Sequence, residues 1–406
     1  MSTIKVEEAL EIILSRIEFK GLEKISITEA LGRTLMEDIV ARRDNPPMDN
    51  SAMDGYALIA ADIESATPEA PVPLTVVGEV AAGYTAQGDA IKSGQAMRIM
   101  TGAPIPAGAD AVIMQEDTDR NGDQLLVKDR ADLHENIRDA GEDVKAGEVV
   151  IPKGARIQPA HIGMMATVGR SQIYVGRKPT VAILSTGDEI LDLDDQPEGP
   201  CIYNSNGYML SAQIRSAGGV PHYLGIARDT EADLMEKFQT ALQCDLVVSS
   251  GGVSVGDYDL VKASLKKMGQ EMLFWKVAMK PGKPLAFGRI GETPVFGLPG
   301  NPVSSFVSFE QFVRPSIKKM AGNPNLKATV VQARLSQAVS KKAGRQHFLS
   351  SITTWEKDGY TVTPAGEQGS GILKSASQAN SLMIFPLEST RIEAGETVSV
   401  QLLEQS

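Results

Sequence analysis

Residues 246–259 read Leu-Val-Val-Ser-Ser-Gly-Gly-Val-Ser-Val-Gly-Asp-Tyr-Asp, and this stretch decides the fold. Its apolar start predicts a buried strand, the serines and glycines end that strand, and a helical pattern begins at Leu260. A strand, a glycine-rich loop and a helix in this order are typical of an anion site, because loop N–H groups and the helix N-terminus face the crevice beyond the strand. Many α/β proteins have such a loop, so the stretch alone does not identify the anion.

The flanking sequence continues the alternation of strands and helices. Strands are predicted at 181–184, 221–226 and 284–288, and helices at 206–216, from about Thr230, and at 303–320. Alternation of this length predicts a doubly wound α/β domain with a parallel or mixed sheet over residues 178–325.

Three other regions have different patterns. An amphipathic helix from Val6 to about Gly21 opens a first domain of residues 1–47, to which the chain returns over 140–177. Short alternating runs punctuated by Gly and Pro predict a β-rich domain at 48–139 and a C-terminal β domain at 326–406. The chain is therefore expected to be an α/β multidomain protein.

Composition excludes several classes of function. The chain has 406 residues, is 42% hydrophobic and carries 51 acidic against 40 basic residues, a net charge of −11. This balance argues against broad binding of nucleic acid or anionic membranes. Cys201 and Cys244 have no metal-ligand spacing, so neither a disulfide framework nor a zinc site is expected. Because no signal-peptide pattern and no apolar run of about 18 residues occur, we expect a cytoplasmic protein.

Charged residues of both signs gather at the expected carboxyl edge of the sheet. They are the carboxylates Asp188, Glu189, Asp257 and Asp259 and the lysines Lys276, Lys280 and Lys283. This combination suits a phosphate with Mg²⁺, which takes one or two carboxylates and fills its other positions with water and phosphate oxygens. The alternative interpretation is that the lysines are solvated charges on an edge strand. No Ser/His/Asp arrangement, Walker loop or GxGxxG pattern is present, so metal-assisted transfer fits better than covalent catalysis.

Seven motifs occur in an order and spacing that resemble the molybdopterin molybdenumtransferase family, which includes the C-terminal domain of gephyrin. They are Ser51-Ala-Met-Asp-Gly-Tyr-Ala57, Arg98-Ile-Met-Thr-Gly-Ala-Pro104, Gly141-Glu-Asp-Val144, Ser185-Thr-Gly-Asp-Glu189, Ser250-Gly-Gly-Val-Ser-Val-Gly-Asp257, Lys280-Pro-Gly-Lys-Pro284 and Leu298-Pro-Gly-Asn-Pro-Val-Ser304. The resemblance implies four domains, including an elongated N-terminal dimerisation domain and a barrel-like C-terminal domain. It also implies insertion of molybdate into adenylylated molybdopterin, with Mg²⁺-dependent release of AMP.

The resemblance assigns roles to individual residues. The pterin phosphate and adenylate would contact Gly251, Gly252, Ser254, Lys276, Lys280, Lys283, Pro299, Gly300, Asn301, Pro302 and Ser304. Asp188, Glu189, Asp257 and Asp259 would serve the anhydride, with Asp188, Glu189 and Asp257 as Mg²⁺ ligands; which of Asp257 and Asp259 faces the metal stays open. In a homodimer with a shared active site, the partner's β domain would supply Asp54, Thr101, Arg138 and Asp143, while Arg345 and Ser370 are candidates for molybdate.

Two positions depart from the family's pattern. Asn204 follows Tyr203 where the family often has Asp, which removes a negative charge, and Ser350 stands where a second arginine usually follows Arg345. These changes leave open a metal-ligand role near Tyr203 and the molybdate role of Arg345.

Other functions compete with the insertase. An adenylyltransferase or nucleotide-pyrophosphate hydrolase would need only residues 178–325, and a dimeric scaffold would bind a peptide at its C-terminal domain. The resemblance also implies contacts with the molybdopterin adenylyltransferase and with apo-molybdoenzymes. Molybdate and tungstate are similar dianions, so the preferred metal stays open.

Overall fold

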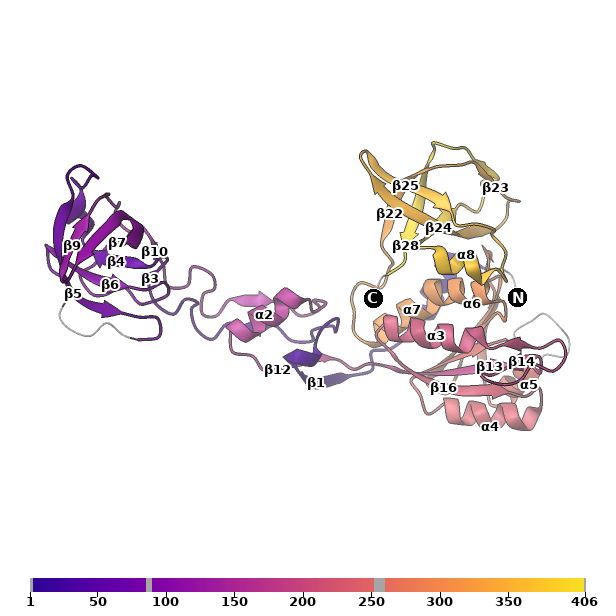
Figure 1. Ribbon diagram of the computed structural model, residues 1–406. Helices are drawn as coiled ribbons and strands as arrows, with labels where there is room; N and C mark the ends of the chain where they lie inside the picture. Colours follow the sequence, from indigo (N-terminus) through magenta and orange to yellow (C-terminus); the bar gives the residue numbers. More distant parts are fainter. Residues whose placement is uncertain (1–2, 85–89, 252–259, 405–406) are drawn as a thin grey trace. The chain divides into compact units, whose positions relative to one another are not determined.

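The computed structural model describes residues 3–84, 90–251 and 260–404 (Figure 1). The chain divides into two compact units. The first comprises residues 1–36, 154–157 and 173–406, and the second comprises 37–153 and 158–172. No helix within these described ranges is both long and apolar enough to cross a membrane.

The first unit contains a mixed α/β sheet. Its order, among the described residues, is β16 (Val220–Ala227), β13 (Thr180–Thr186), β17 (Leu246–Ser250), β21 (Thr293–Leu298), β20 (Pro284–Ile290) and β18 (Glu271–Lys276). The pairings from β16 to β21 are parallel, and the last two are antiparallel. The parallel strands therefore direct their carboxyl ends to one edge, which is where the opening stretch predicted a ligand.

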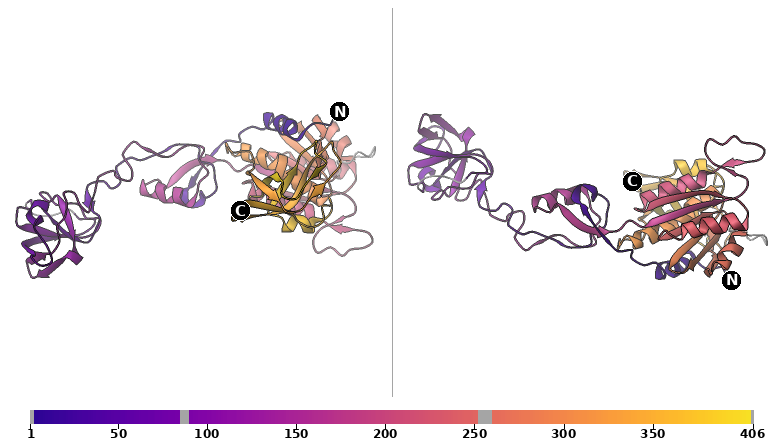
Figure 2. Two further views of the ribbon diagram at one scale, coloured as in Figure 1. Left: turned by 90° about the horizontal axis from the view of Figure 1, so that it is seen from above. Right: turned by 90° about the horizontal axis from the view of Figure 1, so that it is seen from below.

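Helices cover both faces of this sheet. The helices α3 (Ser205–Ser216), α6 (Pro302–Ser308) and α7 (Arg314–Met320) pack on one face together with α1 (Val6–Ser15), and Figure 2 shows α1 against this sheet in both views. The opposite face carries α4 (Glu231–Ala241) and α5 (Leu260–Lys267). Strand alternation divides the core accordingly, with Val181 and Ile183 in one cluster and Ala182 and Leu184 in the other.

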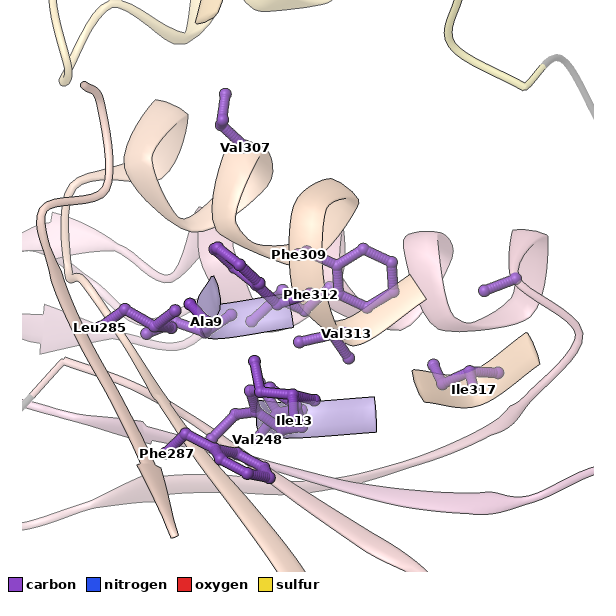
Figure 3. Close-up of a cluster of buried hydrophobic side chains, with 14 of the residues drawn as sticks. Ala9, Ile13, Val248, Leu285, Phe287, Val307, Phe309, Phe312, Val313 and Ile317 are labelled. Carbon is purple, nitrogen blue, oxygen red and sulfur yellow. The ribbon is translucent and has the colours of Figure 1, made fainter. Parts of the chain in front are cut away.

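Figure 3 shows part of the larger cluster, in which Ile13, Val248 and Phe287 lie near Phe312 and Val313. Each fully buried side chain of this size stabilises the fold by about 1.5–3 kcal/mol relative to exposure. This packing holds the sheet and the helix after β21 in one body. The single helix predicted for residues 303–320 is instead interrupted by a π-helical turn at Phe309–Val313, and α1 ends at Ser15 rather than near Gly21.

The C-terminal part of the first unit is a closed barrel. Over the described residues its strands follow the order β24 (Gln346–Glu356), β25 (Gly359–Pro364), β22 (Val330–Leu335), β28 (Thr397–Leu402) and β26 (Ser381–Phe385), and β26 pairs again with β24. The short strand β19 (Met279–Lys280) adds to β24 in parallel, so the barrel is joined to the α/β part. The expectations of a multidomain α/β protein and of a barrel-like C-terminal region are confirmed.

Residues 22–36 pair with returning segments of the chain in the same unit. Strand β1 (Leu22–Ser26) pairs with β12 (Gln172–Gly176), and Leu35 bridges to Val175. Between β1 and this bridge, Ile27–Glu29 forms a single 3-10 turn.

The second unit is built on a β-sheet. Its order in the described ranges is β7 (Ala111–Met114), β4 (Gly55–Leu58), β6 (Gln95–Ile99), β5 (Val72–Val80), β9 (Gln124–Val127) and β8 (Thr118–Asn121). Two short ladders join β2 (Ile39–Val40) to β11 (Val149–Ile151) and β3 (Asn50–Ser51) to β10 (Ile137–Arg138). The helix α2 (Pro159–Thr167) begins with proline in its first turn, where its fixed φ fits and its missing N–H is not needed.

Candidate active site

The carboxyl ends of three parallel strands border a cavity of about 480 Å³, called here the sheet-edge cavity. Its walls include Thr186 at the end of β13, Gly251 after β17 and the segment 299–301 after β21. Ligands of open α/β sheets bind at this edge because the loops that follow the strands diverge there. The place of the cavity agrees with the prediction made from residues 246–259.

Two asparagines organise the polar wall of this cavity. Asn206 donates from Nδ2 to Ser250 Oγ at 2.8 Å and to the Gly300 carbonyl at 2.7 Å, so it ties the loop after β17 to the loop after β21. Asn206 Oδ1 and Thr186 Oγ1 are buried and have no hydrogen-bond partner within the described part of the chain. Buried polar atoms are rarely left unpaired, so both are suited to a polar ligand.

Asn204 has a structural role in the same wall. Its Oδ1 accepts from the Gly207 N–H and from Ser185 Oγ, both at 3.0 Å, and its Nδ2 donates to Tyr223 Oη at 2.6 Å. The side chain therefore caps α3 and joins two neighbouring strands. Burial is the main cause that raises the pKa of Tyr223 to about 12. The Asn204 departure thus leaves a side chain whose polar atoms are already used inside the protein.

Glycine is required where the backbone borders the cavity at Gly251. Its φ is +93°, and a Cβ there would lie 2.7 Å from the Thr186 carbonyl oxygen. A side chain would meet both backbone strain and a close contact. The cavity wall is thus backbone at this point, and backbone can approach a flat or anionic ligand closely.

Carboxylates flank the sheet-edge cavity. Glu189 and Asp229 line it, and the Asp229 N–H donates to Asp188 Oδ1 at 3.2 Å. Partial burial, followed by the charges of Asp188 and Glu189, raises the pKa of Asp229. A local excess of negative charge of this kind favours binding of a cation.

A second cavity, of about 400 Å³, lies between the α/β part and the barrel and is called here the barrel cavity. Lys280, Lys341 and Arg345 line it, and Ser370 lies on the wall formed by the loop before α8 (Leu373–Gln378). The Val303 N–H donates to the Ser370 carbonyl at 3.1 Å. The segment 299–303 consequently borders both cavities, with 299–301 on the first and Val303 on the second.

The second unit holds the other predicted polar residues. Asp54 accepts at Oδ1 from the Thr101 N–H at 2.7 Å and from the Thr101 hydroxyl at 2.8 Å, and these bonds lower the pKa of Asp54. Arg138 and Asp143 line a cavity of about 490 Å³ in this unit, where Asn45 Nδ2 donates to Asp143 Oδ2 at 2.9 Å. Each carboxylate is therefore held in a fixed orientation.

The predicted residues are distributed unevenly over these cavities. The sheet-edge cavity brings together Glu189, Gly251, Pro299, Gly300 and Asn301, and the barrel cavity brings together Lys280, Arg345 and Ser370. Lys276, Lys283, Pro302 and Ser304 line neither of them, and Ser304 is buried in α6. Gly252, Ser254, Asp257 and Asp259 lie outside the described residues.

The sequence interpretation missed Asn206, Asp229, Lys341 and His347. Asp229 follows the end of β16 as Asp188 follows the end of β13, so the reasoning that selected Asp188 could also have found it. Asn206 stands in the first turn of a predicted helix, where polar residues are usually caps. Lys341 follows the short strand β23 (Val339–Ser340) and His347 lies at the start of β24; the sequence pattern does not reveal these strands, and no local signal identifies the two residues.

Comparisons with known proteins agree with this layout over most of the chain. Three family descriptions match: "MoeA N-terminal region (domain I and II)" at residues 4–169, "Probable molybdopterin binding domain" at 182–319 and "MoeA C-terminal region (domain IV)" at 332–403. Proteins named molybdopterin molybdenumtransferase are similar in sequence. The one from Staphylococcus epidermidis is 35% identical over 99% of this chain and 96% of its own length, and the one from Haemophilus influenzae is 36% identical over 98% of each. The crystal structure of the molybdopterin biosynthesis MoeA protein from Pyrococcus horikoshii OT3 matches 99% of this chain and 100% of its own, with 34% identity and a TM-score of 0.84.

Proposed function

Since this chain belongs to the molybdopterin molybdenumtransferase family, whose members are transferases of molybdenum cofactor biosynthesis, we propose that it inserts molybdate into adenylylated molybdopterin and releases AMP with the help of Mg²⁺. One observation carries the proposal. A cavity with carboxylates and unpaired polar atoms and a cavity lined by cations share the segment 299–303 as a wall. A nucleotide-linked pterin and a small dianion can thus bind on either side of one loop.

The sheet-edge cavity takes the pterin phosphate and the adenylate. The amino end of α3 borders this cavity through Asn204 and Asn206, and the Gly251 and Gly300 backbone permits close approach of a phosphate. Thr186 Oγ1 and Asn206 Oδ1 supply a hydroxyl and an amide oxygen for the polar groups of the ligand. These groups bind and orient the anhydride before it is cleaved.

The carboxylates at this cavity fit Mg²⁺ held jointly with substrate phosphate. No three His, Cys, Asp or Glu side chains in the described ranges form a complete metal cage. Mg²⁺ does not require one, because it is commonly held by one or two carboxylates with water and phosphate. Glu189 and Asp188 would hold it with Asp229 beside them, and Asp257 is proposed as a further ligand. When bound, Mg²⁺ neutralises phosphate charge and stabilises the leaving AMP.

The barrel cavity takes molybdate as substrate. Lys280 and Arg345 supply positive charge and N–H donors for a tetrahedral dianion, and Ser370 borders the same space. Ser350 lines this cavity where the family usually has a second arginine, and Lys341, which lines the same cavity, offers a positive charge in its place.

The proposed assembly is a homodimer with a shared active site and the four domains predicted from the sequence. Asp54, Thr101, Arg138 and Asp143 of one copy complete the cleft of the other. The fixed orientation of Asp54 and Asp143 supports a role at a reacting group, because positioning of such groups is a large part of catalysis. The adenylyltransferase that makes the substrate and the apo-molybdoenzymes that receive the product are the proposed transient partners.

The test supplies adenylylated molybdopterin, molybdate and Mg²⁺ to the full chain and measures free AMP and pterin-bound molybdenum. Equal amounts of both products are expected, and chelation of Mg²⁺ should stop both. Glu189→Gln should lower turnover by about a hundredfold or more, whereas Glu236→Gln on the exposed face of α4 should not change it. AMP release without molybdenum in the pterin would contradict the proposal, and pyrophosphate formation from ATP and molybdopterin would favour the adenylyltransferase.

A further inference from the structure

Three neighbouring strands place a histidine on the wall of the barrel cavity. In their register, Lys280 of β19 lies beside His347 of β24, and His347 lies beside Phe385 of β26. All three residues line the cavity. The rings of His347 and Phe385 are 6.4 Å apart between centroids, and the Lys341 ammonium lies 4.9 Å from the Phe385 centroid. The imidazole therefore lies on a cavity wall that also carries the cations Lys280, Lys341 and Arg345.

The imidazole of His347 has polar atoms that the protein does not use. The residue is only 8% exposed, and its ring forms no hydrogen bond to any residue in the described ranges. Burial is the largest cause that lowers the pKa of His347 to about 4, followed by the charges of Lys280, Lys341 and Arg345. Without a ligand the ring is thus neutral near pH 7.

We propose that His347 is a proton-coupled ligand of the oxyanion in the barrel cavity. Its ring donates an N–H to the bound tetrahedral dianion and takes up one proton from solvent as the anion binds. The neutral ring takes the proton on its second nitrogen, where a new N–H bond forms and the buffer acid or hydronium loses its proton. The product is an imidazolium beside the dianion, and no other bond changes. This role rests on the proposed binding of molybdate in the same cavity, and it adds a specificity-determining residue to that site.

The bound dianion changes the electrostatic environment of His347 from one that opposes protonation of the ring to one that favours it. The dianion offsets the charges of Lys280, Lys341 and Arg345, which oppose protonation in the free cavity, and it also attracts the imidazolium directly. The other titratable groups are Lys342 and Glu367 on the cavity wall and Glu388, which acts on Lys341.

Proton uptake has a defined effect on affinity. Between the pKa values of His347 in the free and bound states, the affinity for molybdate falls by up to about tenfold for each unit of rising pH. Above the bound-state pKa it becomes independent of pH. The measurement is isothermal titration calorimetry of the full chain with sodium molybdate, in pairs of buffers with different ionisation enthalpies, at several values from about pH 6 to 8. The buffer dependence of the heat counts the protons taken up.

Variants of His347 distinguish the contribution of the N–H donor from the contribution of proton uptake. His347→Asn keeps an N–H donor, so it should bind with an affinity within about threefold of the parent near pH 8, with no proton uptake at any pH. His347→Phe removes the donor as well and should bind more weakly at every pH. His222→Asn, a matched change on an exposed residue of β16, should behave as the parent.

The outcomes distinguish this role from the proposed function. Binding that depends on Arg345 but shows no proton uptake by the parent near pH 6 would overturn the role of His347 alone. The same holds if His347→Asn takes up as many protons as the parent. If the parent binds no molybdate, or if Arg345→Ala leaves binding unchanged, the assignment of the cavity to the oxyanion fails together with the role of His347. The proton count of the parent decides the question even if a variant does not fold.

Discussion

Gly251→Ala and Gly218→Ala form a matched pair that tests whether the wall of the sheet-edge cavity must be bare backbone. Their φ values are +93° and +90°, so both alanines adopt a conformation that costs about 1–2 kcal/mol. Alanine also lowers the conformational entropy of the unfolded chain, and this offsets about 0.4–1 kcal/mol of that cost in each variant. A Cβ at Gly218 would meet no atom within 4 Å, whereas at Gly251 it would lie 2.7 Å from Thr186 O and 2.9 Å from Thr186 Oγ1.

The difference between the variants therefore reports the close contact. Relief of an overpacked contact costs about 1–3 kcal/mol, so Gly251→Ala should melt roughly 2–12 °C below Gly218→Ala. The end of β13 or the loop at Gly251 must move, and a displacement of about 1 Å at a reacting centre can lower a rate about a hundredfold. Molybdenum insertion by Gly251→Ala should be at least about tenfold slower, and Gly218→Ala should keep the parent rate.

Thermal melting and the insertion assay together can refute this reasoning. If the two variants melt at the same temperature, the contact with Thr186 does not constrain the wall. If Gly251→Ala melts lower but inserts molybdenum at the parent rate, the wall at Gly251 does not contact the substrate.

Three further variants test other parts of the structure. Asp229→Asn should raise Tm near pH 7 and lower turnover. The pKa of Asp229 is raised in the folded state, which means that the ionised carboxylate destabilises the fold. The gain in Tm should therefore vanish as the pH falls below the unfolded-state pKa of 3.8. Arg314→Met should destabilise the first unit by about 3–5 kcal/mol in chemical denaturation, since it leaves Glu310 buried without the bonds of 2.6 and 2.9 Å that Arg314 donates; a loss below about 1 kcal/mol would contradict this. Asn204→Ala should lose the α3 cap and about 1–2 kcal/mol, whereas Asn204→Asp keeps an acceptor for the cap and should lose less, so equal losses would show that the cap contributes little.

The sheet and its ligand edge could be predicted because their sequences are locally distinctive. The apolar run at Leu246 is buried throughout β17, and its serine and glycine end coincides with the edge of the sheet. The strand 181–184 was predicted for the same reason and extends as β13 over Thr180–Thr186. Local composition is sufficient to predict a strand that is buried on both faces between helices, because such a strand is a continuous apolar run.

The barrel was predicted only in outline because its longest strand is polar. Thr353 and Ser381 hydroxyls lie 2.7 Å apart inside the β24–β26 pairing, and the Ser381 hydroxyl also donates to the Ser351 carbonyl at 2.9 Å. Hydrogen bonds across the strands satisfy these buried groups, so the strand has no alternating apolar pattern. The barrel cavity was hidden for a related reason, since Lys280, His347 and Phe385 meet only through the register of three strands that are distant in sequence.

The segment 299–303 borders both the sheet-edge cavity and the barrel cavity, so we expect the ligands proposed for the two cavities to be thermodynamically linked. A ligand that shifts Pro299–Asn301 also shifts Val303, which is fastened to the loop before α8 by its bond to the Ser370 carbonyl. If the nucleotide-linked pterin changes the affinity for molybdate, molybdate must change the affinity for the pterin by the same factor. If the coupling is positive, the two reactants favour the same loop conformation. Each reactant then raises the affinity of the protein for the other.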